Sequence, residues 1–235
     1  MASETIVWKG REGPMDLLVG HATFRPSTVS SLLADALDFA KGSVVIDAGC
    51  GSGVLSIIAA KLGAGQVYGV DAAEDTVAIA SANAEAHGVI DRTQFFEGDL
   101  FEPLPRGIQA DVLIGDVSGI PDELAAATGW FPSGLSGGPT GAELPLRMID
   151  EARAWLSKGG RMFLPTGSLQ DEESILGKAR SAFGNLKQLA ERNIPLPSSI
   201  ADHPALLELL KEKVVKLTQR GSRFLWTARV WELRP

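Results

Sequence analysis

Apolar and polar positions along the chain form blocks that predict strands and helices in alternation. Short apolar runs, typical of strands buried on both faces, occupy residues 44–46, 67–71, 93–97, 110–116 and 161–164. Patterns typical of helices fill residues 54–62, 74–87, 143–156 and 170–183 between them. Such alternation predicts an α/β, Rossmann-like doubly wound fold, with a mostly parallel sheet covered by helices on both faces.

The two ends of the chain add elements to this core. Two apolar pieces within residues 5–24, separated by a Gly- and Pro-containing turn, predict a hairpin. A helix follows, with Leu32, Leu33 and Leu37 on one face, Ser27 or Thr28 as its cap and Gly42 as its end. Two last strands are expected at 186–192 and 222–233, one of them antiparallel at the edge, which gives seven strands in all.

These elements predict a single domain over residues 1–235. It would consist of a cap segment, a core, and C-terminal strands interrupted by an insertion with a helix at 203–217. The boundaries expected are 1–42 for the cap, 43–185 for the core, 186–235 for the C-terminal part and 194–217 for the insertion.

Composition narrows the class of protein. The 235 residues are 45% hydrophobic and 22% charged, as in a globular domain. The net charge of −7 argues against a nucleic-acid partner, because such binding normally needs a basic face. No apolar run is long enough to span a bilayer and no secretion signal is visible, so we expect a cytoplasmic protein without a membrane partner.

Metal and thiol chemistry are not expected. Cys50 is the only cysteine, which excludes an intrachain disulfide and a thiolate cluster. The three histidines are scattered without ligand spacing, so the sequence predicts no metal site.

The chemistry centres on residues 44–53, where an apolar run is followed at once by Gly49, Gly51 and Gly53. A strand, a glycine turn and a helix allow a nucleotide-like ligand to lie against bare backbone. Asp47 stands directly before the turn. The spacing is Gly-x-Gly-x-Gly and not the dinucleotide spacing Gly-x-Gly-x-x-Gly.

Acidic residues end the next two predicted strands. Asp71 lies 22 residues after Gly49, a distance that suits an acid bound to ribose hydroxyls, and Asp99 ends the third strand in Gly-Asp-Leu. Together these residues resemble the class I S-adenosylmethionine (SAM)-dependent methyltransferases. The resemblance implies SAM as cofactor, with the glycine turn facing its methionine part, Asp71 on the ribose, Asp99 on the adenine amine, and Leu100 or Phe101 over the adenine face. A dinucleotide-binding domain and an enzyme relic that binds nothing are the alternatives.

Residues 15–170 resemble one branch in particular, the release-factor glutamine methyltransferases (HemK-type). The similarity lies in the Gly137–Gly141 loop, the helix after it and the Gly159-Gly160 strand. One departure matters, because that branch ends its fourth strand with Asn-Pro-Pro-Tyr where this chain has Asp116-Val117-Ser118-Gly119. It also carries an N-terminal domain for which this chain begins too late, so the glutamine substrate is not carried over.

Asp116 is the first candidate for catalysis, because ligands of open α/β sheets lie at the carboxyl ends of the strands. It is also a candidate for contact with the cofactor, and its alternative role is to cap the turn that follows. His21 is a second candidate base, on a segment expected to fold over the cofactor. Candidates for substrate contact are Arg25, Ser118, Trp130 and Phe131.

The function expected from these residues is SAM-dependent methyl transfer to a nitrogen or oxygen of a small metabolite, by a monomer or homodimer whose partner is that small-molecule substrate. Three other functions remain open. The protein could methylate a protein side chain, or it could consume SAM without methylation, by cyclisation or aminocarboxypropyl transfer that releases methylthioadenosine. It could also bind SAM without catalysis.

Overall fold

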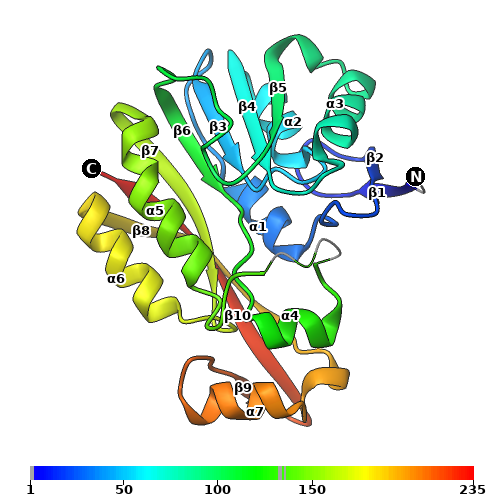
Figure 1. The fold of residues 1–235 in the computed structure, drawn as a ribbon, viewed down its shortest axis with the longest axis vertical. Coiled ribbons are helices and arrows are strands. Elements are labelled where there is room, and N and C mark those ends of the chain that lie inside the picture. Colours follow the sequence, from blue (N-terminus) through cyan, green and yellow to red (C-terminus); the bar gives the residue numbers. More distant parts are fainter. Residues whose placement is uncertain (1–2, 132–133, 135) are drawn as a thin grey trace.

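A computed structural model describes residues 3–131, 134 and 136–235. In this part of the chain, one eight-stranded sheet runs in the order β5-β4-β3-β6-β7-β10-β8, and β9 pairs with the end of β10 (Figure 1). A separate hairpin is formed by β1 (Glu4–Trp8) and β2 (Met15–Val19). The sheet strands are β3 (Val44–Ala48), β4 (Gln66–Asp71), β5 (Thr93–Glu97), β6 (Ala110–Gly115), β7 (Leu156–Gly167), β8 (Asn185–Pro195), β9 (Thr218–Arg220) and β10 (Arg223–Arg234). The helices are α1 (Thr28–Ala36), α2 (Val54–Lys61), α3 (Thr76–Ala86), α4 (Asp122–Thr128), α5 (Glu143–Trp155), α6 (Glu172–Phe183) and α7 (Pro204–Lys211), with short 3₁₀ turns at Ile90–Arg92 and Ser198–Ile200.

The predicted α/β fold is confirmed, with one correction to the strand order. The five strands β3 to β7 pair in parallel, as expected from their helical connections. The antiparallel strand β10 lies between β7 and β8 and not at the edge of the sheet. Its buried Ala228, Val230 and Leu233 suit an inner position, whereas β8 carries exposed charges that suit an edge.

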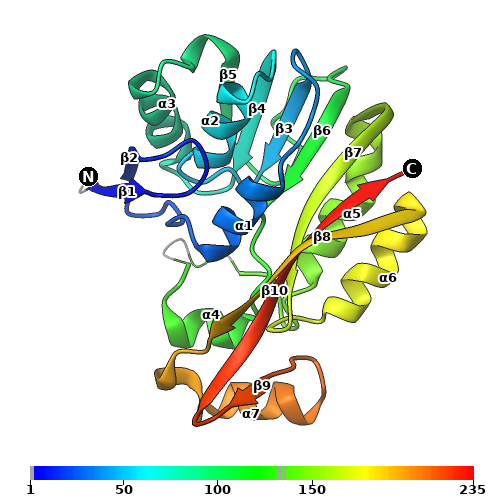
Figure 2. The ribbon, with the colours of Figure 1, turned by 180° about the vertical axis from the view of Figure 1, so that it is seen from behind.

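Helices cover both faces of the sheet (Figures 1 and 2). The hairpin, α1, α2 and α3 pack on one face, and their apolar residues form one continuous core cluster. α5 and α6 pack on the other face, where Phe101, Met148 and Ile149 belong to a second cluster. This double covering is the reason why the central strands are apolar throughout.

The predicted hairpin and first helix are present, but α1 is shorter than expected. Ser27 caps it, as predicted, by accepting hydrogen bonds from the backbone N–H groups of Val29 and Ser30. The helix ends at Ala36, six residues before Gly42. The guanidinium of Arg11 donates to the carbonyl oxygens of Ala34, Asp35 and Leu37, so the hairpin turn satisfies the end of the helix.

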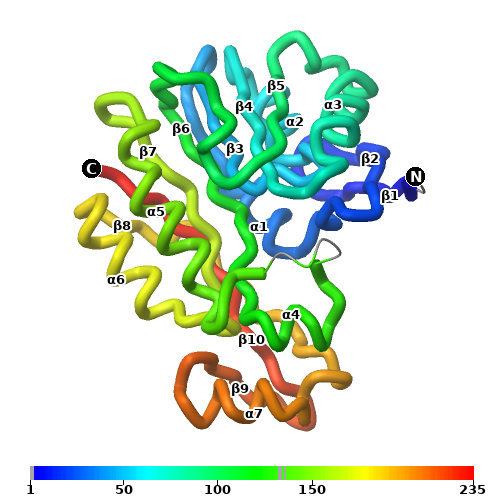
Figure 3. The backbone as a smooth tube through the Cα atoms, viewed as in Figure 1, coloured from blue at the N-terminus to red at the C-terminus, as the bar shows by residue number. Residues whose placement is uncertain are grey.

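The C-terminal half extends well beyond the core. α4, α7 and β9 form a group of elements beyond the core, and the long strand β10 runs from this group back into the main sheet (Figure 3). The sequence did not indicate α4 or β9, and the predicted helix 203–217 ends at Lys211. A third core cluster holds this group together, through Leu124, Leu169, Leu196, Ile200, Ala205, Leu206 and Val215. Among the residues described, no helix is both long and apolar enough to cross a membrane.

Candidate active site

The glycine turn joins β3 to α2 at the carboxyl end of the parallel strands. Gly49, Gly51 and Gly53 all have positive φ, at 81°, 48° and 80°, a conformation that favours glycine. At Gly49 there is also no room for a side chain, because a Cβ would lie 2.4 Å from the carbonyl oxygen of Asp116. The turn after β3 therefore touches the backbone that leaves β6.

Asp71, at the end of β4, organises this turn. One carboxylate oxygen accepts the backbone N–H of Gly51 at 2.9 Å, and the other accepts that of Ala73 at 2.9 Å. Burial raises the pKa of Asp71, and these two hydrogen bonds oppose the rise. Asp71 therefore lies directly beside the glycine turn, and its contact with a ribose stays a prediction.

Two further carboxyl groups lie beside Asp71. Asp47 is fully buried, and its Oδ2 accepts the hydroxyl of Ser56 at 2.6 Å, while its Oδ1 has no hydrogen-bond partner among the described residues. Burial raises the pKa of Asp47 to about 7, with repulsion from Asp116 and Asp71 adding to the rise.

Asp116 is the third member of this group, and its Oδ2 accepts the hydroxyl of Ser30 at 3.0 Å. Burial raises its pKa to about 6, against the lowering effect of that hydrogen bond, and the negative charge of Asp71 raises it further. We call Asp47, Asp71 and Asp116 the acid cluster. Within the described part of the chain they do not form a set of metal-ligating groups, and no cation is among the causes of their pKa shifts.

The predicted adenine-binding residues are separated. Asp99 lies on the surface in an ion pair with Arg147 of α5. Leu100 has a positive φ of 47° and is buried. Phe101 is in the core, with its ring stacked on Trp155 at 5.8 Å between centroids. An exposed ion pair is weak enough to open for a ligand, so Asp99 stays a candidate, and Leu100 stays one beside it. The ring of Phe101 packs inside the core, and its contact with adenine stays a prediction.

The segment before α1 is bound to the turn that follows β4. Asp75 accepts the backbone N–H of Ala22 at 3.0 Å and the hydroxyl of Thr23 at 2.7 Å. Burial alone would raise the pKa of Asp75, but these hydrogen bonds and the neighbouring His21 lower it overall. His21 itself lies between Glu74 and Asp75, at 3.0 and 3.3 Å, so the structure places this predicted base on the β4 side of the site.

The predicted substrate residues fall into different surroundings. Phe131 stacks on Phe24 with ring centroids 5.1 Å apart, which brings the loop after α4 against the segment that precedes α1. The hydroxyl of Ser118 is buried without a hydrogen-bond partner among the described residues. Trp130 packs against the third core cluster, and Arg25 forms an exposed ion pair with Glu4 at 2.9 Å. The roles of these residues remain predictions.

Two residues of the site were not expected from the sequence. Ser30 holds Asp116, and Asp75 fixes the segment over the glycine turn. The Ser27-x-x-Ser30 spacing of a capping box is visible in the sequence and indicates the start of α1, but not that its second serine would face β6.

One segment of the chain is similar to a known family. A family model described as ribosomal protein L11 methyltransferase (PrmA) matches residues 25–121, the segment that carries the glycine turn and the acid cluster. The ribosomal protein L11 methyltransferases of Actinobacillus pleuropneumoniae and Shewanella sediminis are 41% and 44% identical over 101 residues, which cover 43% of this chain. The match spans about a third (33%) of the length of these relatives.

Solved structures share the fold over a longer stretch. A ribosomal protein L11 methylase from Lactobacillus delbrueckii aligns with 91% of this chain and 82% of its own, at a TM-score of 0.57 and 16% identity. The T. thermophilus 16S rRNA methyltransferase RsmC, in complex with AdoMet and guanosine, aligns with 100% of this chain and 51% of its own, at a TM-score of 0.65 and 16% identity.

These matches correct two predictions. A small metabolite as substrate and partner was wrong, because the relatives are named for the methylation of a ribosomal protein. The family model and the relatives described above are L11 methyltransferases, so the predicted branch of the release-factor glutamine methyltransferases is not confirmed. The predicted superfamily is confirmed: the chain has the fold of the class I SAM-dependent methyltransferases, and its segment 25–121 is similar to the ribosomal protein L11 methyltransferases.

Proposed function

We propose that this protein binds SAM at the glycine turn and transfers its methyl group to an amine nitrogen of a protein substrate. The observation that carries the proposal is the contact between Gly51 and Asp71, which lies inside the segment that matches the L11 methyltransferases. A ribosomal protein such as L11 is the first substrate to test, and such a substrate agrees with the expected cytoplasmic location.

The acid cluster fits a cationic ligand. Three carboxyl groups lie close together, burial raises their pKa values, and Asp47 Oδ1 has no partner among the described residues. Buried carboxylates without a counter-charge are costly, so a ligand that brings positive charge is favoured there. SAM carries a sulfonium and an ammonium group, and both suit these acids.

The chain supplies positioning and a proton acceptor. When bound, SAM provides a methyl group on a positively charged sulfur. The new N–C bond forms as the S–C bond breaks, the electron pair of that bond stays on sulfur, and the proton leaves the nitrogen. Asp116 accepts a hydrogen bond from the amine and receives that proton, and Ser30 fixes the orientation of its carboxylate. The partnerless hydroxyl of Ser118 offers a second acceptor for the amine.

The first experiment incubates the purified protein with SAM, alone and with ribosomal protein L11, and follows nucleoside products and protein mass. We expect S-adenosylhomocysteine only when a protein acceptor is present, with a gain in acceptor mass of about one methyl group per transfer. Release of methylthioadenosine from SAM alone would contradict methyl transfer.

A substitution links the proposal to the site. In the Asp71→Ala variant, the glycine turn loses its acceptor and the ligand loses the predicted ribose contact, so we expect SAM to bind at least tenfold more weakly, since charge-assisted hydrogen bonds contribute about 1.5–3 kcal/mol. Isothermal titration calorimetry measures the affinity. Asp91→Ala, at an exposed acid in the turn before β5, is the control and should bind SAM as the unmodified protein does.

A further inference from the structure

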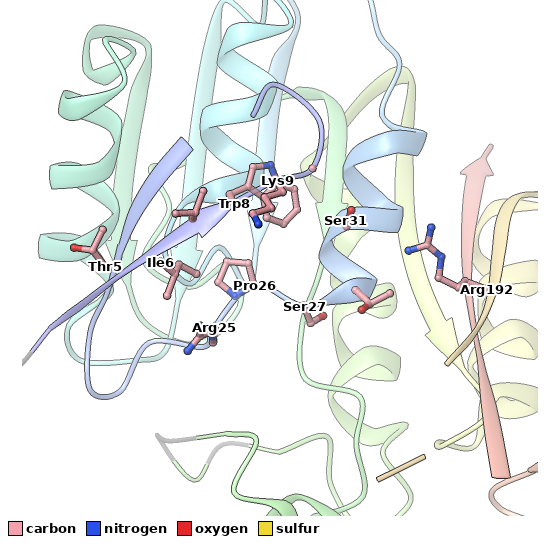
Figure 4. Close-up of a pocket in the computed structure, with 12 residues that line it drawn as sticks. Thr5, Ile6, Trp8, Lys9, Arg25, Pro26, Ser27, Ser31 and Arg192 are labelled. Atoms are coloured by element: carbon pink, nitrogen blue, oxygen red, sulfur yellow. The ribbon is translucent and has the colours of Figure 1, made fainter. Parts of the chain in front are cut away.

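A groove of about 570 Å³ runs beside the N-terminal hairpin, outside the site described above. Figure 4 shows the residues that line it, which come from β1, from the segment that leads into α1, from α1 itself and from β8. They are Thr5, Ile6, Val7, Trp8, Lys9, Gly10, Arg25, Pro26, Ser27, Thr28, Ser31 and Arg192.

The groove follows a free strand edge. β1 pairs with β2 and, within the described residues, with no other strand. Side chains alternate between the two faces of a strand, so a cavity on one face would be lined by every second residue. Here all six residues from Thr5 to Gly10 line it. The cavity therefore lies along the edge, where backbone N–H and C=O groups point away from β2.

The charge of the groove is opposite to that of the protein. Its lining contains Lys9, Arg25 and Arg192 and no acidic residue, in a chain whose net charge is −7. Arg25 is paired with Glu4, but Lys9 and Arg192 are exposed and form no ion pair with any residue that the structure describes. The exposed Val7 adds an apolar side chain to the same edge, at 53% of its full accessibility.

The groove adjoins the segment that covers the glycine turn. Pro26 and Ser27, which line the groove, follow in the chain on Phe24, which stacks on Phe131 and lies beside Gly51. Ser27 caps α1, and Ser30 in the first turn of that helix holds Asp116. A chain bound in the groove thus lies against the same short segment that covers the glycine turn.

We propose that the free edge of β1 binds an extended, acidic segment of the protein substrate by strand addition, with Lys9 and Arg192 pairing with its carboxylates. This inference rests on the proposed function for the identity of the partner. Strand addition takes its affinity from main-chain hydrogen bonds and its selectivity from side chains. A segment of about five residues, some 17 Å long, matches the length of β1.

The test uses labelled nonapeptides of alternating glutamate and valine, with fluorescence anisotropy at low salt and no SAM. One matched peptide carries lysine in place of glutamate. Two more carry backbone N-methyl groups at alternate positions, on odd residues in one and on even residues in the other. We expect the acidic peptide to bind about tenfold more tightly than the lysine peptide. One N-methylated peptide should keep its affinity and the other should lose it, because only one edge of the peptide faces β1.

Variants locate the binding site. The double variant Lys9→Gln/Arg192→Gln should lose the preference for the acidic peptide. Arg220→Gln, at an exposed cation on β9, is the matched control and should keep it. Equal binding of both N-methylated peptides, or of the acidic and lysine peptides, would overturn the proposal.

Two other occupants are separate outcomes. Displacement of the peptide by a single-stranded RNA whose binding is also lost in the double variant would assign the groove to nucleic acid and overturn the proposal. A dimer in analytical ultracentrifugation that dissociates on Val7→Lys would assign the edge to a second copy. SAM affinity is measured by calorimetry on the same samples: SAM binding without peptide binding defeats only this inference, and peptide binding without SAM binding defeats only the proposed function.

Discussion

At the scale of single residues, the carboxyl groups of the site receive few stabilising contacts from the rest of the protein. Asp47 is buried and Asp116 is half-buried, each has one hydroxyl partner, and both have raised pKa values. A raised pKa means that the folded protein binds the proton more tightly than the unfolded chain does. Such residues are typical of functional sites, where a ligand supplies the missing counter-charge.

Asp116→Asn is expected to stabilise the protein at high pH. The pKa of Asp116 rises from 3.8 to about 6 on folding, so the free energy of unfolding falls as the pH rises from about 4 through 6. Asparagine does not titrate, and its carbonyl still accepts the Ser30 hydroxyl. We therefore expect a gain of about 1–3 kcal/mol at pH 8 and none at pH 4.

Urea unfolding at the two pH values measures this effect. Asp91→Asn, at an exposed acid, is the control and should leave the difference between the two pH values unchanged. A loss of stability of equal size at pH 4 and pH 8 would show that Asp116 is a structural residue whose charge is satisfied.

At the scale of elements, the strands and turns of the core follow from local sequence, but their contacts with the N-terminal segment do not. The apolar runs, Gly49 and Asp71 were sufficient to predict β3, β4 and the turn between β3 and α2. The contact of Arg11 with the end of α1, and that of Phe24 with Phe131, join positions 23 to 107 residues apart. No periodicity encodes such pairs, because they depend on how the elements pack.

Arg11→Ala should destabilise the protein by about 1–2 kcal/mol. The substitution removes hydrogen bonds from a cation to the last carbonyl groups of α1, where a positive charge is also attracted by the negative end of the helix dipole. Arg11→Lys keeps the charge but not the forked geometry, so it should recover part of the loss. Thermal unfolding measures the stability, and hydrogen exchange should show less protection in residues 28–36. An unchanged exchange rate there would contradict the capping role.

Phe131→Ala should affect the bound cofactor more than the fold. The stacked pair with Phe24 contributes about 0.5–1.5 kcal/mol and joins two segments beside the glycine turn. We expect SAM to dissociate several-fold faster in stopped-flow experiments, with only a small fall in the midpoint of thermal unfolding. Leu207→Ala, at an exposed apolar residue on α7, is the control. An equal increase in the rate of SAM dissociation in both variants would show that the stacked pair has no specific part in retaining SAM.

At the scale of the whole molecule, the sequence predicted the parallel core and its ligand edge but not the C-terminal extension. Alternating strands and helices leave few possible topologies, which is why the parallel pairing of β3 to β7 was predictable. α4 and α7 pack through the third core cluster, whose members are spread from Leu124 to Val215, and the inner position of β10 depends on Ala228, Val230 and Leu233 of the other two clusters. The substrate was predicted wrongly, because the glycine turn and the acids that follow it indicate the cofactor and carry no signal for the size of the molecule that is methylated.

Ligand binding provides a test of the acid cluster in the intact protein. SAM at 100 times its dissociation constant should add about 2.7 kcal/mol to the stability, which corresponds to an increase of about 5–10 °C in the midpoint of thermal unfolding. S-adenosylhomocysteine lacks the methyl group of SAM and has a neutral sulfur. As the pH rises from 5 to 8, Asp116 and Asp47 ionise and attract the sulfonium more strongly, so the advantage of SAM over S-adenosylhomocysteine should grow. Calorimetric titrations of both ligands at the two pH values measure this ratio of affinities. In Asp116→Asn, the ratio should increase less between pH 5 and pH 8. A ratio of affinities that does not change with pH would show that the three carboxyl groups do not face the sulfonium, and the cation that they are arranged to hold would then be the amine of the substrate.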